Sequence, residues 1–395
     1  MTTENQSLKI KSKLPDIGTT IFTVMSQLAV DHKAINLGQG FPEFNPDEQL
    51  LELVNEAMKA HNQYAPMPGI PALRHEIAKK IKILYGHDIN PDTEVTVTSG
   101  ATEALMVAIQ AVVHPGDEVI IIEPNYDSYV PCIRLAGGIP VYVQLNKPTK
   151  NKTSYSMNWQ QLKEAITSKT KLIILNFPHN PTGITLEQED LDTLAEIVRD
   201  KNIFLIADEV YEHIIFKSKR FLSFLTHPEL REKTFAISSF GKTYHNTGWK
   251  IGYCIAPQSL TVEFRKIHQF TVFSVNTPMQ IALAKFMQDP SHYLNLSKFY
   301  EKKHDLLFEG LQKTKFKPIA SDGTFFLLAD YSEISDQLEA DFAIYLTKEV
   351  GVTLIPVSAF YQDTKSSDAN NQMLRFCFAK SDETLEKAIE LLSVF

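Results

Sequence analysis

A lysine in a glycine-rich loop is the residue of this chain best suited to covalent chemistry. Lys242 stands in the segment Ser238–Gly252 (SSFGKTYHNTGWKIG), directly after the apolar run 234–238. That run is typical of a buried strand, so Lys242 is predicted to lie past a strand's carboxyl end, where open α/β sheets bind ligands. Ser239 can offer a hydroxyl and Lys250 a charge to an anion, and the glycines allow close backbone approach. A loop lysine can also be merely solvated, so the assignment depends on partners elsewhere.

Three polar residues follow two other apolar runs. Asp208 closes the run 203–207, Tyr211 lies three residues later, and Asn180 opens Asn-Pro-Thr-Gly after the run 172–175. An ionised Asp208 could keep a ring nitrogen protonated. Asn180 and Tyr211 could donate hydrogen bonds to a phenolic oxygen and favour its anion. Asp208 could instead cap the next segment, and Asn-Pro-Thr-Gly is also an ordinary turn sequence.

A possible phosphate cradle and an aromatic wall precede these residues. The segment Thr98-Ser-Gly-Ala-Thr follows a strand-like run and opens a helix-like one. Backbone amides at a helix N-terminus attract phosphate, so Gly100, Ala101 and Thr102 are candidates to bind one. Ser99 could simply cap that helix. Tyr126, in Glu-Pro-Asn-Tyr-Asp, could stack on a planar ring, although an aromatic residue after a strand is often part of the core.

Arg375 is a cation within the apolar segment 373–379. A guanidinium in such surroundings should be paired, and its planar fork suits a carboxylate; an internal salt bridge is the alternative. Together, these groups are those that a pyridoxal 5'-phosphate (PLP) site requires from a protein that must hold, orient and tune its cofactor. We therefore predict that Lys242 holds PLP as a Schiff base and acts as the catalytic residue.

Alternating apolar runs predict the scaffold that positions these residues. Helix-length amphipathic segments such as 101–113, 125–136 and 186–201 lie between the runs. This alternation favours an α/β fold, a large domain with a mainly parallel sheet between helices. The seven strands are predicted at 95–98, 119–122, 140–144, 172–175, 203–207, 235–237 and 251–255.

The pattern changes after Pro257 and indicates a smaller α+β domain. We predict an N-terminal arm at 1–45 that packs with this small domain, a large PLP-binding domain at 46–288, and a C-terminal small domain at 289–395. Long helical patterns cover 258–288 and 291–314, strands are predicted at 324–329, 353–355 and 373–378, and a last helix at 382–393.

Composition narrows the function classes. The chain has 395 residues, 44% of them hydrophobic, and a net charge of −8 without a basic block, which argues against a nucleic-acid partner. The three cysteines lie in apolar contexts, as buried thiols in a reducing compartment do. No apolar run approaches the about 18 residues of a membrane span, and the N-terminus lacks a signal peptide's apolar core. We expect a cytoplasmic enzyme, and we assign no metal ligands.

The order of these motifs resembles class I aminotransferases of fold type I across essentially the whole chain. The lysine loop and Leu37-Gly-Gln-Gly-Phe-Pro are similar to the branch with methionine aminotransferases and kynurenine–oxoglutarate transaminases. The resemblance implies the PLP-dependent transferase fold and a homodimer with shared active sites. It places Gly40 beside the substrate carboxylate, Phe22 near the substrate side chain, and Tyr64 at the partner subunit's phosphate. Many members have arginine at the position of Lys250, where lysine keeps the charge but loses the fork.

The resemblance also implies the reaction. A PLP-dependent aminotransferase of amino-acid metabolism would move the amino group of an apolar or aromatic L-amino acid to a 2-oxo acid by ping-pong chemistry. We expect methionine first, then kynurenine, phenylalanine, tyrosine or glutamine, because Phe22, Tyr64 and Tyr126 favour an apolar pocket. One alternative is a cysteine-S-conjugate β-lyase that uses the same site. A remote one is a non-catalytic regulator that keeps the fold, although no DNA-binding segment fits before residue 15.

Overall fold

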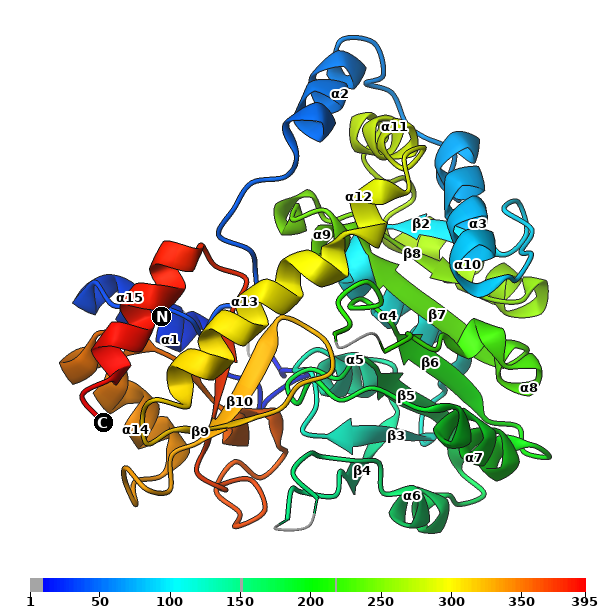
Figure 1. Ribbon diagram of the computed structural model, residues 1–395. Helices are drawn as coiled ribbons and strands as arrows, with labels where there is room; N and C mark the ends of the chain where they lie inside the picture. The colour runs from blue at the N-terminus through cyan, green and yellow to red at the C-terminus, as the bar shows by residue number, and fades with distance from the viewer. Residues whose placement is uncertain (1–9, 150–151, 217–218) are drawn as a thin grey trace, which may run out of the picture.

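The computed structural model describes residues 10–149, 152–216 and 219–395, so the first nine residues of the predicted arm lie outside it (Figure 1). Its large sheet has seven strands, and only β8 runs antiparallel to its neighbours, which confirms the predicted sheet. The strand order is β2 (Val95–Thr98), β8 (Gly252–Ile255), β7 (Thr234–Ser239), β6 (Phe204–Asp208), β5 (Thr170–Asn176), β3 (Glu118–Glu123) and β4 (Ile139–Gln144).

Both faces of the large sheet are buried, as its nearly continuous apolar strands require. In β5, Leu172 and Ile174 join one hydrophobic cluster, and Ile173 and Leu175 join another on the opposite face. The first cluster includes residues of α4 (Gly100–Val112), α5 (Tyr129–Leu135) and α10 (Gln258–Thr271). The second includes residues of α6 (Trp159–Ala165) and α7 (Gln188–Val198). A third cluster, beside β2 and β8, contains residues of α2 (Glu48–Met58), α3 (Pro71–Tyr85) and α11 (Thr277–Phe286).

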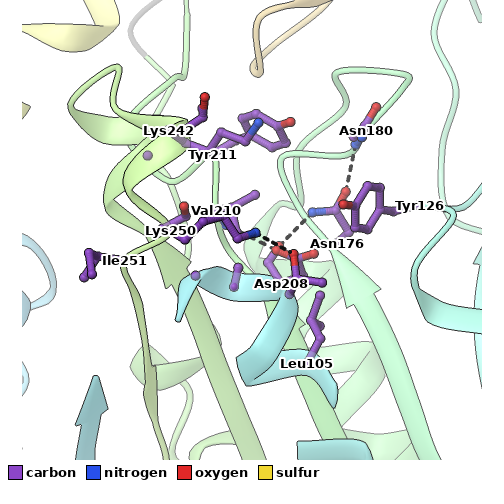
Figure 2. Close-up of a pocket in the computed structure, with 16 residues that line it drawn as sticks. Leu105, Tyr126, Asn176, Asn180, Asp208, Val210, Tyr211, Lys242, Lys250 and Ile251 are labelled. Carbon is purple, nitrogen blue, oxygen red and sulfur yellow. Dashed lines mark hydrogen bonds between the residues drawn. The ribbon is translucent and has the colours of Figure 1, made fainter. Parts of the chain in front are cut away.

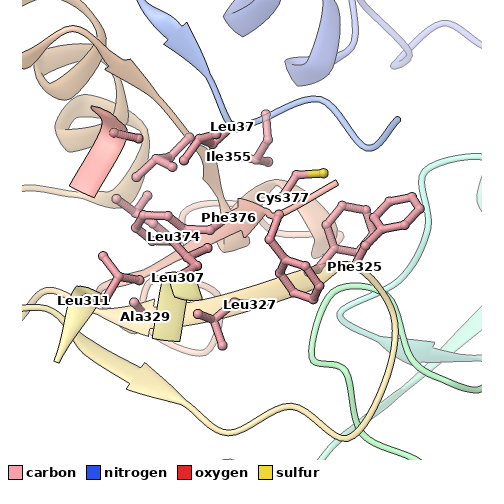
Figure 3. Close-up of a cluster of buried hydrophobic side chains, with 14 of the residues drawn as sticks. Leu37, Leu307, Leu311, Phe325, Leu327, Ala329, Ile355, Leu374, Phe376 and Cys377 are labelled. Atoms are coloured by element: carbon pink, nitrogen blue, oxygen red, sulfur yellow. The ribbon is translucent and has the colours of Figure 1, made fainter. Parts of the chain in front are cut away.

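A second, antiparallel sheet is built by the C-terminal part of the chain. Its strand order is β12 (Ile355–Pro356), β13 (Met373–Cys377), β10 (Phe326–Asp330) and β9 (Lys317–Ile319), packed with α13 (Leu296–Leu311), α14 (Glu339–Tyr345) and α15 (Asp382–Leu392). Figure 3 shows its core, in which Leu37 joins Leu374 and Phe376. The N-terminal α1 (Ile21–His32) packs there too, and β1 (Ile35–Asn36) pairs with β11 (Val352–Thr353).

Two segments that were each predicted as one long helical stretch are divided into two helices in the structure. The segment 258–288 is divided into α10 and α11, because Phe273 has a left-handed φ of 68° and the Asn276 side chain caps α11 by accepting from Met279 N at 3.2 Å. The segment 291–314 is divided into α12 (Ser291–Leu294) and α13. The predicted helix 125–136 begins only at Tyr129, and strand β9 was not predicted.

Two further expectations concern the cysteines and membranes. All three cysteines are free and buried, as predicted. Within the described ranges, every helix is too short or too polar to cross a bilayer.

Candidate active site

A cavity of about 160 Å³ opens where several strands of the large sheet end. Asn176, Asp208 and Ser239 are the last residues of β5, β6 and β7, and all three line it. The side chains labelled in Figure 2 converge on this space from separate segments of the chain. The predicted site residues in its lining are Gly100, Ala101, Thr102, Tyr126, Asn180, Asp208, Tyr211, Ser239, Lys242 and Lys250.

Lys242 presents a buried amine to the cavity. It lies on the short helix α9 (Phe240–Thr243), and its Nζ donates a hydrogen bond to the Gly40 carbonyl at 3.0 Å. Nζ also lies 5.6 Å from the ring centre of Tyr211. Burial lowers the pKa of Lys242 to about 8, and the charge of Arg375 acts in the same direction. This amine therefore becomes neutral, and nucleophilic, far more readily than an exposed lysine.

The buried carboxylate of Asp208 accepts from two neighbours, and a third neighbour donates to its backbone carbonyl. Tyr129 Oη donates to its Oδ2 at 2.6 Å, and Val210 N to its Oδ1 at 3.4 Å. Asn176 Nδ2 donates to the Asp208 backbone carbonyl at 2.8 Å. Burial raises the pKa of Asp208 to about 6, although the Tyr129 hydroxyl, the Val210 amide and the charge of Lys242 all oppose this rise. A cation placed against this carboxylate would favour its charged form.

Asn180 connects this edge of the sheet to Arg375. Its backbone N–H donates to Asn176 Oδ1, and its side-chain Oδ1 accepts from Arg375 Nη1, both at 2.9 Å. With the oxygen turned toward Arg375, the Asn180 amide N–H₂ group remains to donate to a ligand. The Tyr211 ring stands edge-on to Phe325, with ring centres 5.2 Å apart, which fixes its plane.

The first turn of α4 forms a concave backbone surface with a positive charge beside it. Gly100 has a φ of +75°, and a Cβ at Gly252 would lie 2.8 Å from Ala101 N, so both positions require glycine. Lys250 Nζ donates to Thr102 Oγ1 at 3.3 Å. The first amides of a helix have no intrahelical partner and attract anions. The alternative role of Ser99 is not observed, because its side chain makes no capping hydrogen bond.

Arg375 is only 1% exposed, yet none of the described carboxylates forms a salt bridge with it. Its Nη2 donates to the Gly38 carbonyl at 2.9 Å, and its Nε is buried without a hydrogen-bond partner. The rings of Phe22, Phe326 and Phe360 surround the guanidinium, with centres 5.2, 3.9 and 4.9 Å from Cζ. The internal salt bridge considered above is therefore not formed among the described residues, and the guanidinium keeps N–H groups, including Nε–H, that can bind a carboxylate.

Four predicted residues lie outside this lining, namely Arg375, Gly40, Phe22 and Tyr64. The Gly40 carbonyl accepts a hydrogen bond from Lys242 Nζ, and the Phe22 ring packs against the guanidinium of Arg375. Tyr64 is 82% exposed, and its ring centre lies 5.3 Å from that of Phe273. One chain therefore does not bring Tyr64 to its own cavity.

Sequence analysis missed two residues of this site, Tyr129 and Asn176. Asn176 closes β5 as Asp208 closes β6, so the same rule of a polar residue ending an apolar strand could have found it. Tyr129 lies three residues after Tyr126, and its contact with Asp208 requires the folded position of α5.

The sequence and fold place the chain among known enzymes. The family model for aminotransferase class I and II matches residues 32–392. The chain belongs to this aminotransferase family. It is 47% identical to a methionine aminotransferase of Escherichia coli over 98% of this chain and 99% of that protein. It is 36% identical to a kynurenine–oxoglutarate transaminase of Dictyostelium discoideum, over 97% of this chain and 95% of that protein.

Solved structures agree with this membership. A crystal structure of an Escherichia coli protein with an identified methionine aminotransferase function matches with a TM-score of 0.94 and 46% identity, over 98% of this chain and 100% of that one. N-succinyldiaminopimelate aminotransferase from Mycobacterium tuberculosis matches with a TM-score of 0.93 and 38% identity, over the same shares. This chain is thus an enzyme of a family that uses PLP and acts on amino acids and 2-oxo acids.

The residues around the cavity fit that cofactor. The buried Lys242 amine, whose pKa is lowered to about 8, suits an aldehyde. The buried Asp208 carboxylate suits a ring N–H⁺. The first turn of α4, with Lys250 beside it, suits a phosphate. The described residues contain no group of three or more His, Cys, Asp or Glu side chains placed to hold a metal ion.

Proposed function

We propose that this aminotransferase takes the amino group of an apolar or aromatic L-amino acid, methionine first, and passes it to a 2-oxo acid. The observation that carries the proposal is the aromatic enclosure of Arg375 by Phe22, Phe326 and Phe360. The α-carboxylate would bind the guanidinium, and the substrate side chain would meet rings.

We propose a division of labour in which each end of the cofactor has its own residues. Asp208 pairs with the ring nitrogen, Asn180 and Tyr211 donate to the phenolic oxygen, and Tyr126 covers the ring. The first turn of α4 (Gly100, Ala101 and Thr102), Ser239 and Lys250 hold the phosphate. Gly40 lies beside the substrate carboxylate, and its carbonyl also orients the Lys242 amine.

Lys242 would act as both nucleophile and proton carrier. PLP, when bound, supplies a ring that accepts electrons when the substrate α-carbon loses its proton. Burial lowers the pKa of Lys242 to about 8 and so favours its neutral amine, which could be released from the cofactor when a substrate amine takes its place. The neutral amine accepts the α-proton and returns it to the cofactor side, as a general base and then a general acid. Asp208 would hold the ring nitrogen of the bound cofactor in its protonated form.

Single-turnover reactions of the holoenzyme with a panel of amino acids test this substrate class. The visible absorption band should disappear fastest with methionine, kynurenine or an aromatic amino acid, and slowly with aspartate. A faster reaction with aspartate than with methionine would contradict the proposed pocket. Release of pyruvate and ammonia from a cysteine S-conjugate, without an added 2-oxo acid, would instead reveal β-lyase activity.

We propose a homodimer in which Tyr64 completes the partner's phosphate site. The support is its 82% exposure beside Phe273, another exposed aromatic residue at 43%. Mixed dimers of Lys242→Ala and Tyr64→Ala subunits provide the test. Random mixing should raise the activity above that of either variant alone, toward about a quarter of the wild-type activity, because half of the dimers regain one intact site of two. No recovery in confirmed mixed dimers would refute a shared site.

We also propose that the chain has two main units. The N-terminal arm, 1–45, packs with the C-terminal small domain, 289–395, and residues 46–288 form the large domain. The support for this division is the shared core of α1, Leu37 and the C-terminal elements. Limited proteolysis that releases residues 46–288 as a stable fragment would agree with this division, and initial cleavage inside that range would contradict it.

We propose a cytoplasmic location from the three buried free thiols, and cell fractionation tests it.

A further inference from the structure

A fully buried histidine outside the cavity has a hydrogen-bond acceptor against each of its two ring nitrogens. His268, on α10, is 0% exposed. Its Nδ1 lies 2.7 Å from Glu103 Oε1, and its Nε2 lies 3.0 Å from the Met67 carbonyl oxygen. A carbonyl can only accept, and so can an ionised carboxylate, so with Glu103 ionised both contacts are hydrogen bonds only if each ring nitrogen carries a hydrogen. A ring protonated at both nitrogens is a cation.

We propose that His268 is a doubly protonated positioning residue that joins the first turn of α4 to the segment 63–69 and thereby sets the geometry of the phosphate cradle. This inference rests on the proposed role of Gly100, Ala101 and Thr102 in binding the cofactor phosphate. His268 itself touches neither the cavity nor any residue assigned there, so it acts through Glu103.

Glu103 transmits the position of His268 to the cradle. Its Oε1 accepts from the imidazole, and its Oε2 accepts from Ser99 N at 2.7 Å. Ser99 directly precedes Gly100, whose carbonyl accepts from Thr98 Oγ1 at 3.1 Å. The Glu103 side chain is only 8% exposed, and a buried carboxylate that loses its counter-ion is costly. The positive ring therefore keeps Glu103 charged and turned toward the Ser99 amide.

Met67 connects His268 to the segment that presents Tyr64. Ser274 Oγ donates to the Ala65 carbonyl at 3.0 Å, and Val97 N to the Pro68 carbonyl at 3.0 Å, so this segment is fixed on both sides of Met67. One ring thus fixes two elements, the first turn of α4 and the segment proposed to reach the partner's phosphate.

Two other ionisable groups near Glu103, Arg265 and Cys254, do not pair with its carboxylate. Arg265, one turn earlier on α10, directs its guanidinium to Thr96 Oγ1 and to the Val95 carbonyl, at 3.0 and 2.7 Å. Cys254, on β8, is buried, and its pKa is raised by that burial and by the charge of Glu103, so it stays a neutral thiol. In the proposed arrangement the imidazole is the group that pairs with this carboxylate, with Nδ1 2.7 Å from Oε1.

The protonation state can be measured on the wild-type holoenzyme. Nitrogen-15 NMR of histidine-labelled protein at pH 7.5 should show both His268 nitrogens with attached hydrogens, assigned as the signals that a His268→Asn variant lacks. Neutron diffraction of holoenzyme crystals gives the same result without any variant. A hydrogen on only one nitrogen would overturn the proposal.

The positioning role needs variants with separate readouts at the two ends of the cofactor. His268→Asn and Glu103→Gln should each weaken PLP binding at least about tenfold, the usual scale for one charged hydrogen bond. Both should shift the phosphorus-31 signal of the bound phosphate. The pH titration of the visible band should stay unchanged, because Asp208 and Asn180 are untouched. His114→Asn, at an exposed position just past the other end of α4, is the matched control and should change nothing.

The possible results are distinguishable from failure of the proposed function. Unchanged PLP affinity and phosphorus signal in both variants would overturn the positioning role, and so would an equal change at the ring end. If a variant does not fold, the wild-type nitrogen or neutron measurement still decides the protonation state. A different preferred amino donor would contradict the proposed substrate but leave every His268 measurement as expected.

Discussion

The Tyr129 hydroxyl should control the ionisation of Asp208, and Tyr129→Phe isolates that effect. The substitution removes the donor 2.6 Å from Oδ2 while the phenyl ring keeps its packing. A hydrogen bond to a charged group contributes about 1.5–3 kcal/mol, which corresponds to roughly one to two pKa units. The lost donor had favoured the carboxylate, so the pKa of Asp208 should rise from about 6 toward roughly 7–8.

Carbon-13 NMR of aspartate-labelled apoenzyme measures this shift directly, with Asp208 assigned from a variant that lacks it. At pH 7 the ionised fraction should fall from about nine-tenths to half or less. Tyr331→Phe is the matched control, because that hydroxyl donates to the Gln337 carbonyl at 2.8 Å in the C-terminal part of the chain. An unchanged or lowered pKa of Asp208 in Tyr129→Phe would refute this account of its electrostatics.

Two further predictions concern Lys242 and Arg375. In the apoenzyme, modification of Lys242 by an amine-selective reagent, followed by peptide mapping, should reach half-maximum near pH 8, because burial favours the neutral amine; a midpoint near that of an ordinary lysine, about 10.4, would contradict this. Arg375→Lys should lower kcat/KM roughly 10- to 100-fold, mainly through KM, because lysine loses one charged hydrogen bond to the substrate carboxylate. Steady-state kinetics beside the exposed control Arg199→Lys would show it, and equal kinetics for both variants would remove Arg375 from the site.

The large sheet could be predicted because its strands are buried on both faces and are apolar at nearly every position. The position of the site could also be predicted, because the carboxyl ends of parallel strands meet at one edge of the sheet and bring Asp208, Ser239 and Asn180 together. The boundary between α10 and α11 could not be predicted from periodicity. Apolar residues continue through it, and the chain turns there only because Phe273 adopts a left-handed conformation and Asn276 caps the next helix.

The features of the site that could not be predicted from the sequence depend on contacts between distant segments. Arg375 and Asn180 are 195 residues apart, and their hydrogen bond requires the two sheets to be packed together. Tyr129 reaches Asp208 only after α5 has packed on the sheet, and the paired acceptors around His268 come from two separate segments. Spacing in a sequence predicts which residues end strands, but not which of them share a hydrogen bond.

The covalent attachment point of the cofactor is the central claim. Borohydride reduction of the holoenzyme, followed by digestion and mass spectrometry of the peptides, tests it most directly. We predict one pyridoxyl adduct, on Lys242, and none in a Lys242→Ala variant, which should also have no transamination turnover. An adduct on another lysine, or full turnover without Lys242, would contradict the account.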